Sequence, residues 1–131
     1  MNKVIIYTDG ACKGNPGPGG WGVLLKAEGI ERELFGGEDL TTNNRMELMA
    51  VIFGLTQLKT NCRVSIYSDS KYVIDGIEKG WAKKWRSKNW MRTPRDKAIN
   101  ADLWAQLLML CERHDVNFTW VKGHNGHPQN E

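Results

Sequence analysis

Long hydrophobic stretches are absent from this 131-residue sequence, in which no run reaches the roughly eighteen apolar residues of a membrane-spanning helix. The first residues also lack the basic segment, long apolar stretch and small-residue cleavage site of a secretory leader. We therefore expect a protein that has no membrane partner and is located in the cytoplasm.

Cysteine is scarce, and its spacing forms no metal-binding or disulfide pattern. The three cysteines are Cys12, Cys62 and Cys111, and this odd number without a Cys-x-x-Cys pair argues against a disulfide scaffold. His124 and His127 are three residues apart, but they lie among glycine and proline with no cysteine nearby. A structural zinc site is therefore not expected.

The glycine-rich segment 14–20 lacks the features of a nucleotide-binding loop. It has neither the Gly-Lys-Ser/Thr ending of a P-loop nor the spacing of a dinucleotide fingerprint. We expect no ATP binding and interpret the segment as a tight turn between two strands.

The composition is that of an ordinary globular domain. Hydrophobic residues make up 40% and charged residues 25% of the sequence, which argues against disorder. A chain of this length can bury a core without disulfides or metals. We therefore expect a single domain over residues 1–131.

Apolar periodicity predicts an alternation of strands and helices. Strands are expected at residues 3–8, 21–26, 31–35, 64–67 and 117–122, the first three as an antiparallel meander with turns at 14–20 and 28–29. Helices are expected at 46–58, capped by Asn43 or Asn44, at 71–79, and after a capping Asn100. The predicted fold class is α/β, a five-stranded mixed sheet of order 3-2-1-4-5 with helices on both faces.

Three carboxylates occupy related positions in this arrangement. Asp9 and Asp69 each follow a predicted strand, and Glu47 lies near the start of the helix between them. A right-handed crossover brings the ends of two parallel strands to one edge of the sheet, where Glu47 can reach them. Carboxylates held close together repel one another, and a hard cation relieves that repulsion. The sequence therefore predicts a site for magnesium or manganese.

Each carboxylate also has an ordinary structural explanation. Asp9-Gly10 is typical of a turn, and Glu47 favours the positive end of its helix dipole. Asp69 precedes a helix and could cap it, as Ser68 or Ser70 could equally. Only the combination of the three favours a metal site.

Five short blocks follow one another along the sequence: Tyr7-Thr8-Asp9-Gly10-Ala11, Gly14-Asn15-Pro16-Gly17, Thr42-Asn43-Asn44-Arg45-Met46-Glu47, Ser68-Asp69-Ser70 and Val121-Lys122-Gly123-His124. In residues and spacing they resemble type 1 ribonuclease H over essentially the whole chain. The resemblance implies a ribonuclease H-like fold and a metal-dependent endonuclease. Such an enzyme hydrolyses the RNA strand of an RNA/DNA hybrid to 5'-phosphate and 3'-hydroxyl ends.

The resemblance also implies roles for individual residues. Asp9, Glu47 and Asp69 correspond to catalytic carboxylates that hold two magnesium ions, with manganese as the alternative. His124 corresponds to a histidine of a flexible loop that assists water delivery or product release. Asn15 and Thr42 would hold a phosphate of the DNA strand, and Asn43 would contact bases near the minor groove.

The segment that follows the second predicted helix is strongly basic. Residues 79–97, named here the basic arm, carry eight Lys or Arg residues against the single acid Asp96. The tryptophans interleaved with these cations are Trp81, Trp85 and Trp90. They could anchor the arm while its cations bind phosphates, or they could simply pack a solvated helix onto the body. By resemblance, Trp81 lies beside DNA sugars. The cations expected to bind phosphate are Lys83, Lys84, Arg86 and Lys88.

The sequence departs from the family pattern at its end. The family continues past Asn130-Glu131 into a C-terminal helix that carries a fourth metal-site residue, usually Asp. We expect the chain as given to lack that helix, which would reduce activity or favour association of an otherwise monomeric protein. Two other interpretations are a hybrid-binding module that has lost cleavage and a related integrase or transposase-like core.

Overall fold

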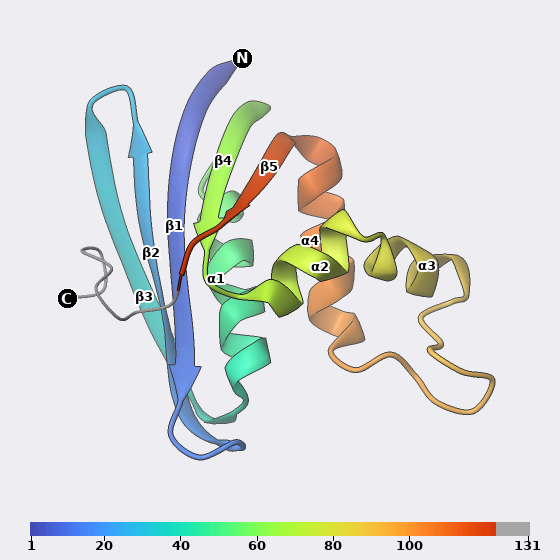
Figure 1. Ribbon diagram of the computed structural model, residues 1–131. Helices are drawn as coiled ribbons and strands as arrows, with labels where there is room; N and C mark the ends of the chain where they lie inside the picture. Colours follow the sequence, from blue (N-terminus) through green and yellow to red (C-terminus); the bar gives the residue numbers. More distant parts are fainter. Residues whose placement is uncertain (123–131) are drawn as a thin grey trace.

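The computed structural model describes residues 1–122 of the chain, so the expected loop histidine His124 lies outside the described residues. Five strands of this described segment form one sheet (Figure 1). They are β1 (Asn2–Cys12), β2 (Gly17–Ala27), β3 (Ile30–Thr41), β4 (Cys62–Ser68) and β5 (Asp115–Trp120). Their order is β3-β2-β1-β4-β5, which confirms the predicted order.

Strand β1 lies at the centre of the sheet and fixes the position of its neighbours. It pairs antiparallel with β2, where Asp9 is opposite Gly22, and parallel with β4, where Tyr7 is opposite Tyr67. Strand β5 continues the parallel part of the sheet beside β4. The sheet is therefore mixed, as predicted, and β1 and β4 end at the same edge.

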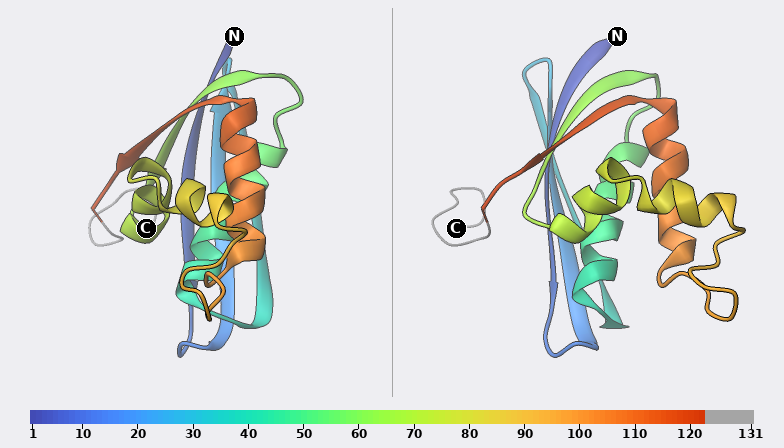
Figure 2. Two further views of the ribbon diagram at one scale, coloured as in Figure 1. Left: turned by 90° about the vertical axis from the view of Figure 1, so that its right-hand side faces the viewer. Right: turned by 45° about the vertical axis from the view of Figure 1, so that its right-hand side comes forward.

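In the described part of the chain, four helices accompany the sheet: α1 (Asn43–Thr56), α2 (Lys71–Glu78), α3 (Trp81–Ser87) and α4 (Ala101–Arg113). Figures 1 and 2 show the sheet on one side and these helices on the other. Within residues 1–122 the helices thus cover one face of the sheet, whereas the sequence predicted helices on both. The alternation along β1 agrees, because Val4 and Ile6 are buried while Ile5 and Tyr7, on the other face, are not.

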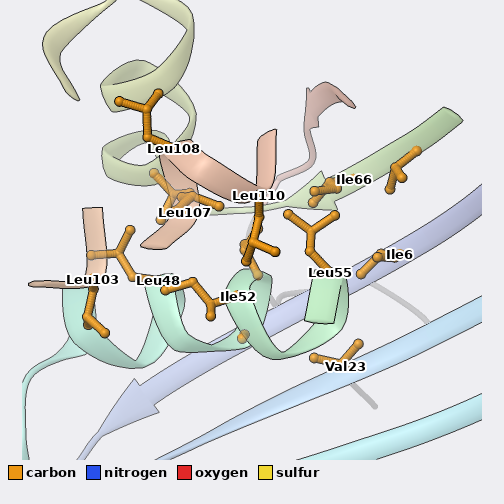
Figure 3. Close-up of a cluster of buried hydrophobic side chains, with 14 of the residues drawn as sticks. Ile6, Val23, Leu48, Ile52, Leu55, Ile66, Leu103, Leu107, Leu108 and Leu110 are labelled. Carbon is orange, nitrogen blue, oxygen red and sulfur yellow. The ribbon is translucent and has the colours of Figure 1, made fainter. Parts of the chain in front are cut away.

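The hydrophobic core lies between the sheet and helices α1 and α4 (Figure 3). Side chains that are almost completely buried come from β1, β4, α1 and α4, and they include Ile6, Ile66, Leu48, Leu55 and Leu107. Trp104 of α4 is fully buried, and a Cβ placed on Gly76 of α2 would collide with its ring. Core packing thus holds α2 directly against α4.

The glycine-rich segment is only partly a turn. Residues Gly17 to Gly20 belong to β2, where Gly19 and Gly20 pair with β1 and Gly17 pairs with β3, so the turn itself is limited to residues 13–16. A Cβ on Gly19 would lie 2.8 Å from the carbonyl oxygen of Ala11 and the Cβ of Cys12. Glycine is required here because strands approach closely, which corrects the prediction of a turn over 14–20.

The caps of the helices also differ from the sequence-based prediction. Thr42, and not Asn43 or Asn44, caps α1, because its hydroxyl accepts a 3.2 Å hydrogen bond from Arg45 N. Ser70 caps α2 in the same way, which leaves Asp69 for another role. Asn100 precedes α4 but makes no side-chain capping bond.

In residues 1–122, no helix is both long enough and apolar enough to cross a membrane.

Candidate active site

The three carboxylates predicted to converge do so. Asp9 lies near the end of β1, Glu47 in the second turn of α1, and Asp69 directly after β4. One carboxylate oxygen from each of the three residues lies within 4.8 Å of the others. The parallel register of β1 and β4 explains the pairing of Asp9 with Asp69, since each follows a matched tyrosine by two residues.

Gly10 allows the third carboxylate to reach the other two. A Cβ at this position would lie 2.5 Å from the carbonyl carbon of Met46 and 2.7 Å from Glu47 N. Any larger residue would therefore push the start of α1 away from β1. The close contact between these backbones places Glu47 beside Asp9.

Trp120 holds the backbone of Asp69 from the neighbouring strand. Its indole Nε1 donates a 3.1 Å hydrogen bond to the carbonyl oxygen of Asp69, and Val121 N donates to the carbonyl of Ser68 at 2.9 Å. Lys71 Nζ lies 4.6 Å from the centre of the indole ring, in cation–π range. The sequence analysis missed this role for Trp120, and no local pattern signals it.

The electrostatics of the cluster centre on Glu47, which is only 9% exposed. Burial, then a hydrogen bond and charge repulsion from Asp69, then the charge of Asp9, raise its pKa to about 9. Its Oε1 is buried and accepts no hydrogen bond from the residues that the structure describes. Ionising Glu47 beside two other carboxylates is unfavourable, and a hard divalent cation would offset this because it prefers oxygen ligands. The three side chains are therefore the candidate ligands.

The residues expected to contact the DNA strand, Asn15 and Thr42 at a phosphate and Asn43 at bases, lie together where the β1–β2 turn meets the start of α1. Asn43 N donates to the side-chain oxygen of Asn15 at 3.1 Å, and Cys12 N donates to the side-chain oxygen of Asn43 at 2.7 Å. Thr42 is the adjacent helix cap. Because both amide oxygens already accept bonds, the NH₂ groups of the two asparagines are the ones suited to an anion.

The basic arm extends from the body of the protein, away from the sheet (Figure 1). Trp81 is 39% exposed, and Lys83, Lys84 and Lys88 are exposed. Arg86 differs from these lysines, because its guanidinium makes two 2.8 Å hydrogen bonds to Glu112 of α4. The structure therefore places three lysines and Trp81 at the surface while Arg86 anchors the arm.

The other tryptophans of the arm pack inward. The ring of Trp85 lies edge-on to that of Trp104, with 6.0 Å between ring centroids, and Trp90 is half-buried beside the core. The packing explanation considered from the sequence thus holds for Trp85 and Trp90, whereas Trp81 remains accessible.

Comparisons with known proteins identify the family of the chain. A family model described as RNase H matches residues 1–131. The ribonuclease H of Desulforamulus reducens is 58% identical over 131 residues, which are 100% of this chain and 82% of that protein. The ribonuclease H of Trichodesmium erythraeum is 57% identical over 129 residues, covering 98% of this chain and 82% of that protein.

Among solved structures, LC9-RNase H1, a type 1 RNase H with the type 2 active-site motif, is similar with a TM-score of 0.85 and 36% sequence identity. The match covers 99% of this chain and 67% of that one. The full-length family match, the high identity and the shared fold lead to one conclusion. This chain belongs to the ribonuclease H family and is an endoribonuclease.

Proposed function

We propose that the chain hydrolyses the RNA strand of RNA/DNA hybrids in a reaction that requires magnesium and leaves 5'-phosphate and 3'-hydroxyl ends. The observation that carries this proposal is the convergence of Asp9, Glu47 and Asp69 within 4.8 Å at one edge of the sheet. Family membership supports the choice of substrate.

In the proposed site, Asp9, Glu47 and Asp69 would hold two magnesium ions, with manganese as a substitute. Bound magnesium would supply the Lewis acidity that activates a water molecule for attack on the phosphodiester and offsets charge on the leaving 3'-oxygen. Gly10 and Trp120 keep the ligands in place through the backbones of α1 and Asp69. His124, which lies outside the described residues, is proposed to move protons near the scissile bond.

The proposed substrate surface has two parts. The NH₂ groups of Asn15 and Asn43, together with Thr42, contact the DNA strand near the start of α1. Lys83, Lys84 and Lys88 neutralise phosphates at the basic arm, with Trp81 beside a sugar. Arg86 contributes chiefly by fixing the arm to α4 through Glu112.

The proposed catalytic unit is a single domain that acts as a monomer. One hydrophobic core shared by the sheet and its helices supports the single-domain proposal. The oligomeric state and the cytoplasmic location stay predictions.

A cleavage assay tests this function. A hybrid carrying separate labels on RNA and DNA is incubated with the protein in magnesium and, in parallel, in EDTA. We expect cleavage of the RNA strand alone, dependence on magnesium, and products that a ligase requiring a 5'-phosphate accepts.

The variants Asp9→Asn and Asp69→Asn should each reduce cleavage by at least about a hundredfold, because each removes a charged ligand. A DNA duplex of the same sequence serves as the control substrate. Binding of the hybrid without products, or cleavage that persists in EDTA, would contradict the proposal.

A further inference from the structure

A polar network joins the first turns of three helices, and Arg45 is at one end of it. The guanidinium of Arg45 donates to both carboxylate oxygens of Asp102, at 3.1 and 2.8 Å. It also donates to the side-chain oxygen of Asn100 at 3.1 Å. One arginine of α1 thus holds two residues at the start of α4.

The network continues to α2 through one hydroxyl group. Tyr72 OH accepts hydrogen bonds from Asn100 Nδ2 at 3.1 Å and from Trp104 Nε1 at 3.0 Å. Trp104 is fully buried, so this end of the network is anchored in the core. The sequence of contacts Arg45, Asn100, Tyr72 and Trp104 therefore links α1, α4 and α2.

Two of the three carboxylates lie in or beside these helices, Glu47 within α1 and Asp69 just before α2. Arg45 precedes Glu47 by two residues at the start of α1, and Tyr72 follows Asp69 by three residues in the first turn of α2. A shift of either helix start would move a carboxylate oxygen relative to the other two. The network is thus placed to fix the distance between Glu47 and Asp69.

Asn100 also connects this network to the basic arm. It is the last residue before α4, and its backbone has a φ of 62°, in the left-handed region that favours glycine. Its side chain does not cap α4 but bonds to Arg45 and Tyr72. The segment that leads back from the basic arm therefore ends on the same contacts that hold α1 and α2.

We propose that Arg45 is a positioning residue of the nuclease site. Through this network it fixes the position of Glu47 relative to Asp69 and connects both to Asn100, where the segment that follows the basic arm ends. The proposal rests on the function proposed above. It requires the planar fork of arginine, because a lysine cannot engage both oxygens of Asp102 and the oxygen of Asn100 together. The ion pair is partly exposed, so its contribution to overall stability is small and its main effect is on orientation.

The decisive variant is Arg45→Lys, which keeps the charge but loses the fork. We expect magnesium affinity, measured by calorimetry without nucleic acid, to weaken about tenfold, as is usual when a residue supporting a metal ligand is lost. We also expect kcat on the hybrid to fall about tenfold because the carboxylates are misplaced. The melting temperature should change by only a few degrees.

Asp102→Asn removes the other half of the pair and should give the same two defects. The double variant Arg45→Lys/Asp102→Asn should be no worse than either single variant, since all three lose one interaction.

Arg63→Lys is the matched control. Arg63 also pairs with an aspartate, Asp115 at 3.4 Å, but this pair joins β4 to β5 at the start of both strands, away from the carboxylates. Its magnesium affinity and kcat should match those of the unaltered protein.

If Arg45→Lys keeps magnesium affinity and kcat within twofold of the unaltered protein, the proposal is overturned. Should that variant fail to fold, Tyr72→Phe replaces it, because it deletes only the shared hydroxyl group; normal magnesium affinity and kcat in Tyr72→Phe would be equally decisive. Failure of the proposed function is distinguishable, because it would leave the unaltered protein without cleavage. The magnesium affinities of the variants would still report on positioning.

Discussion

At the scale of single residues, the protonation of Glu47 makes the properties of the site depend on pH. It is the most buried of the three carboxylates, and its pKa of about 9 means that the metal-free protein holds a proton there at neutral pH. Magnesium binding at the proposed site would therefore displace that proton. The same group makes folding depend on pH.

We predict that the free energy of unfolding of the metal-free protein falls as pH rises from about 4.5 to about 9. Over this interval the unfolded chain has released the Glu47 proton while the folded protein keeps it, so a rising pH favours unfolding. The slope contributed by one proton is at most about 1.4 kcal/mol per pH unit. Glu47→Gln removes the titrating group and should flatten the dependence. Urea unfolding at pH 6, 7 and 8 in EDTA measures it, and parallel curves for both proteins would refute the prediction.

Gly10 is the second residue whose role can be tested directly, because the backbones of β1 and α1 leave no space for a side chain there. We predict that Gly10→Ala destabilises the fold by about 1 to 3 kcal/mol and weakens magnesium binding, because the new methyl group would collide with the backbone of Met46 and Glu47. Gly22→Ala is the control, since a Cβ there meets no atom of residues 1–122 within 4 Å. Thermal unfolding and magnesium calorimetry on both variants give the answer. Equal behaviour of the two variants would show that the close approach is not needed.

At the scale of elements, sequence patterns identified the strands and the apolar helices but not their ends. Strand β2 begins at Gly17 rather than at residue 21, because backbone hydrogen bonds continue where glycines provide no side-chain pattern. The cap of α1 was misplaced by one or two residues because Thr42, Asn43 and Asn44 are all good capping residues. Asn43 and Asn15 instead bond to each other across the turn, a contact between segments distant in sequence.

The basic arm gives a prediction at this scale. The triple variant Lys83→Ala, Lys84→Ala and Lys88→Ala should raise KM for the hybrid more than it lowers kcat, since these exposed cations face solvent rather than the carboxylates. The slope of log affinity against log salt concentration should become shallower by about 2 to 3. Fluorescence anisotropy with labelled hybrid at several salt concentrations measures both effects. An unchanged slope would exclude the arm from phosphate binding.

Arg86 should behave differently from its lysine neighbours. Arg86→Ala breaks its bidentate pair with Glu112 and should loosen the arm from α4, with a smaller change in the salt slope than the lysine variant shows. Hydrogen exchange of the amides in α3, compared with that of the triple lysine variant, reports on this loosening. A salt slope as shallow as that of the triple variant would assign Arg86 to phosphate binding instead.

At the scale of the whole molecule, the sheet order and the meeting of the three carboxylates followed from chain connectivity and were predictable. The meander sets the neighbours of β1, and the right-handed crossover through α1 sets β4 beside it. The contacts that refine the site were not predictable. Trp120 is 51 residues from Asp69, and Arg45 is 57 residues from Asp102, so both depend on the assembled fold.

A metal ion bound at the proposed site would couple metal binding to the stability of the entire fold. We predict that magnesium raises the free energy of unfolding by about 2.7 kcal/mol at a concentration one hundred times its Kd, because the separated carboxylates of the unfolded chain do not form the site. Asp9→Asn should respond differently in two ways. Without metal it should be more stable than the unaltered protein, since it relieves repulsion among carboxylates within 4.8 Å. With magnesium it should gain little. Melting temperatures across a magnesium series, against sodium chloride at equal ionic strength, separate the two effects. Equal stabilisation of both proteins would mean that magnesium acts elsewhere on the molecule.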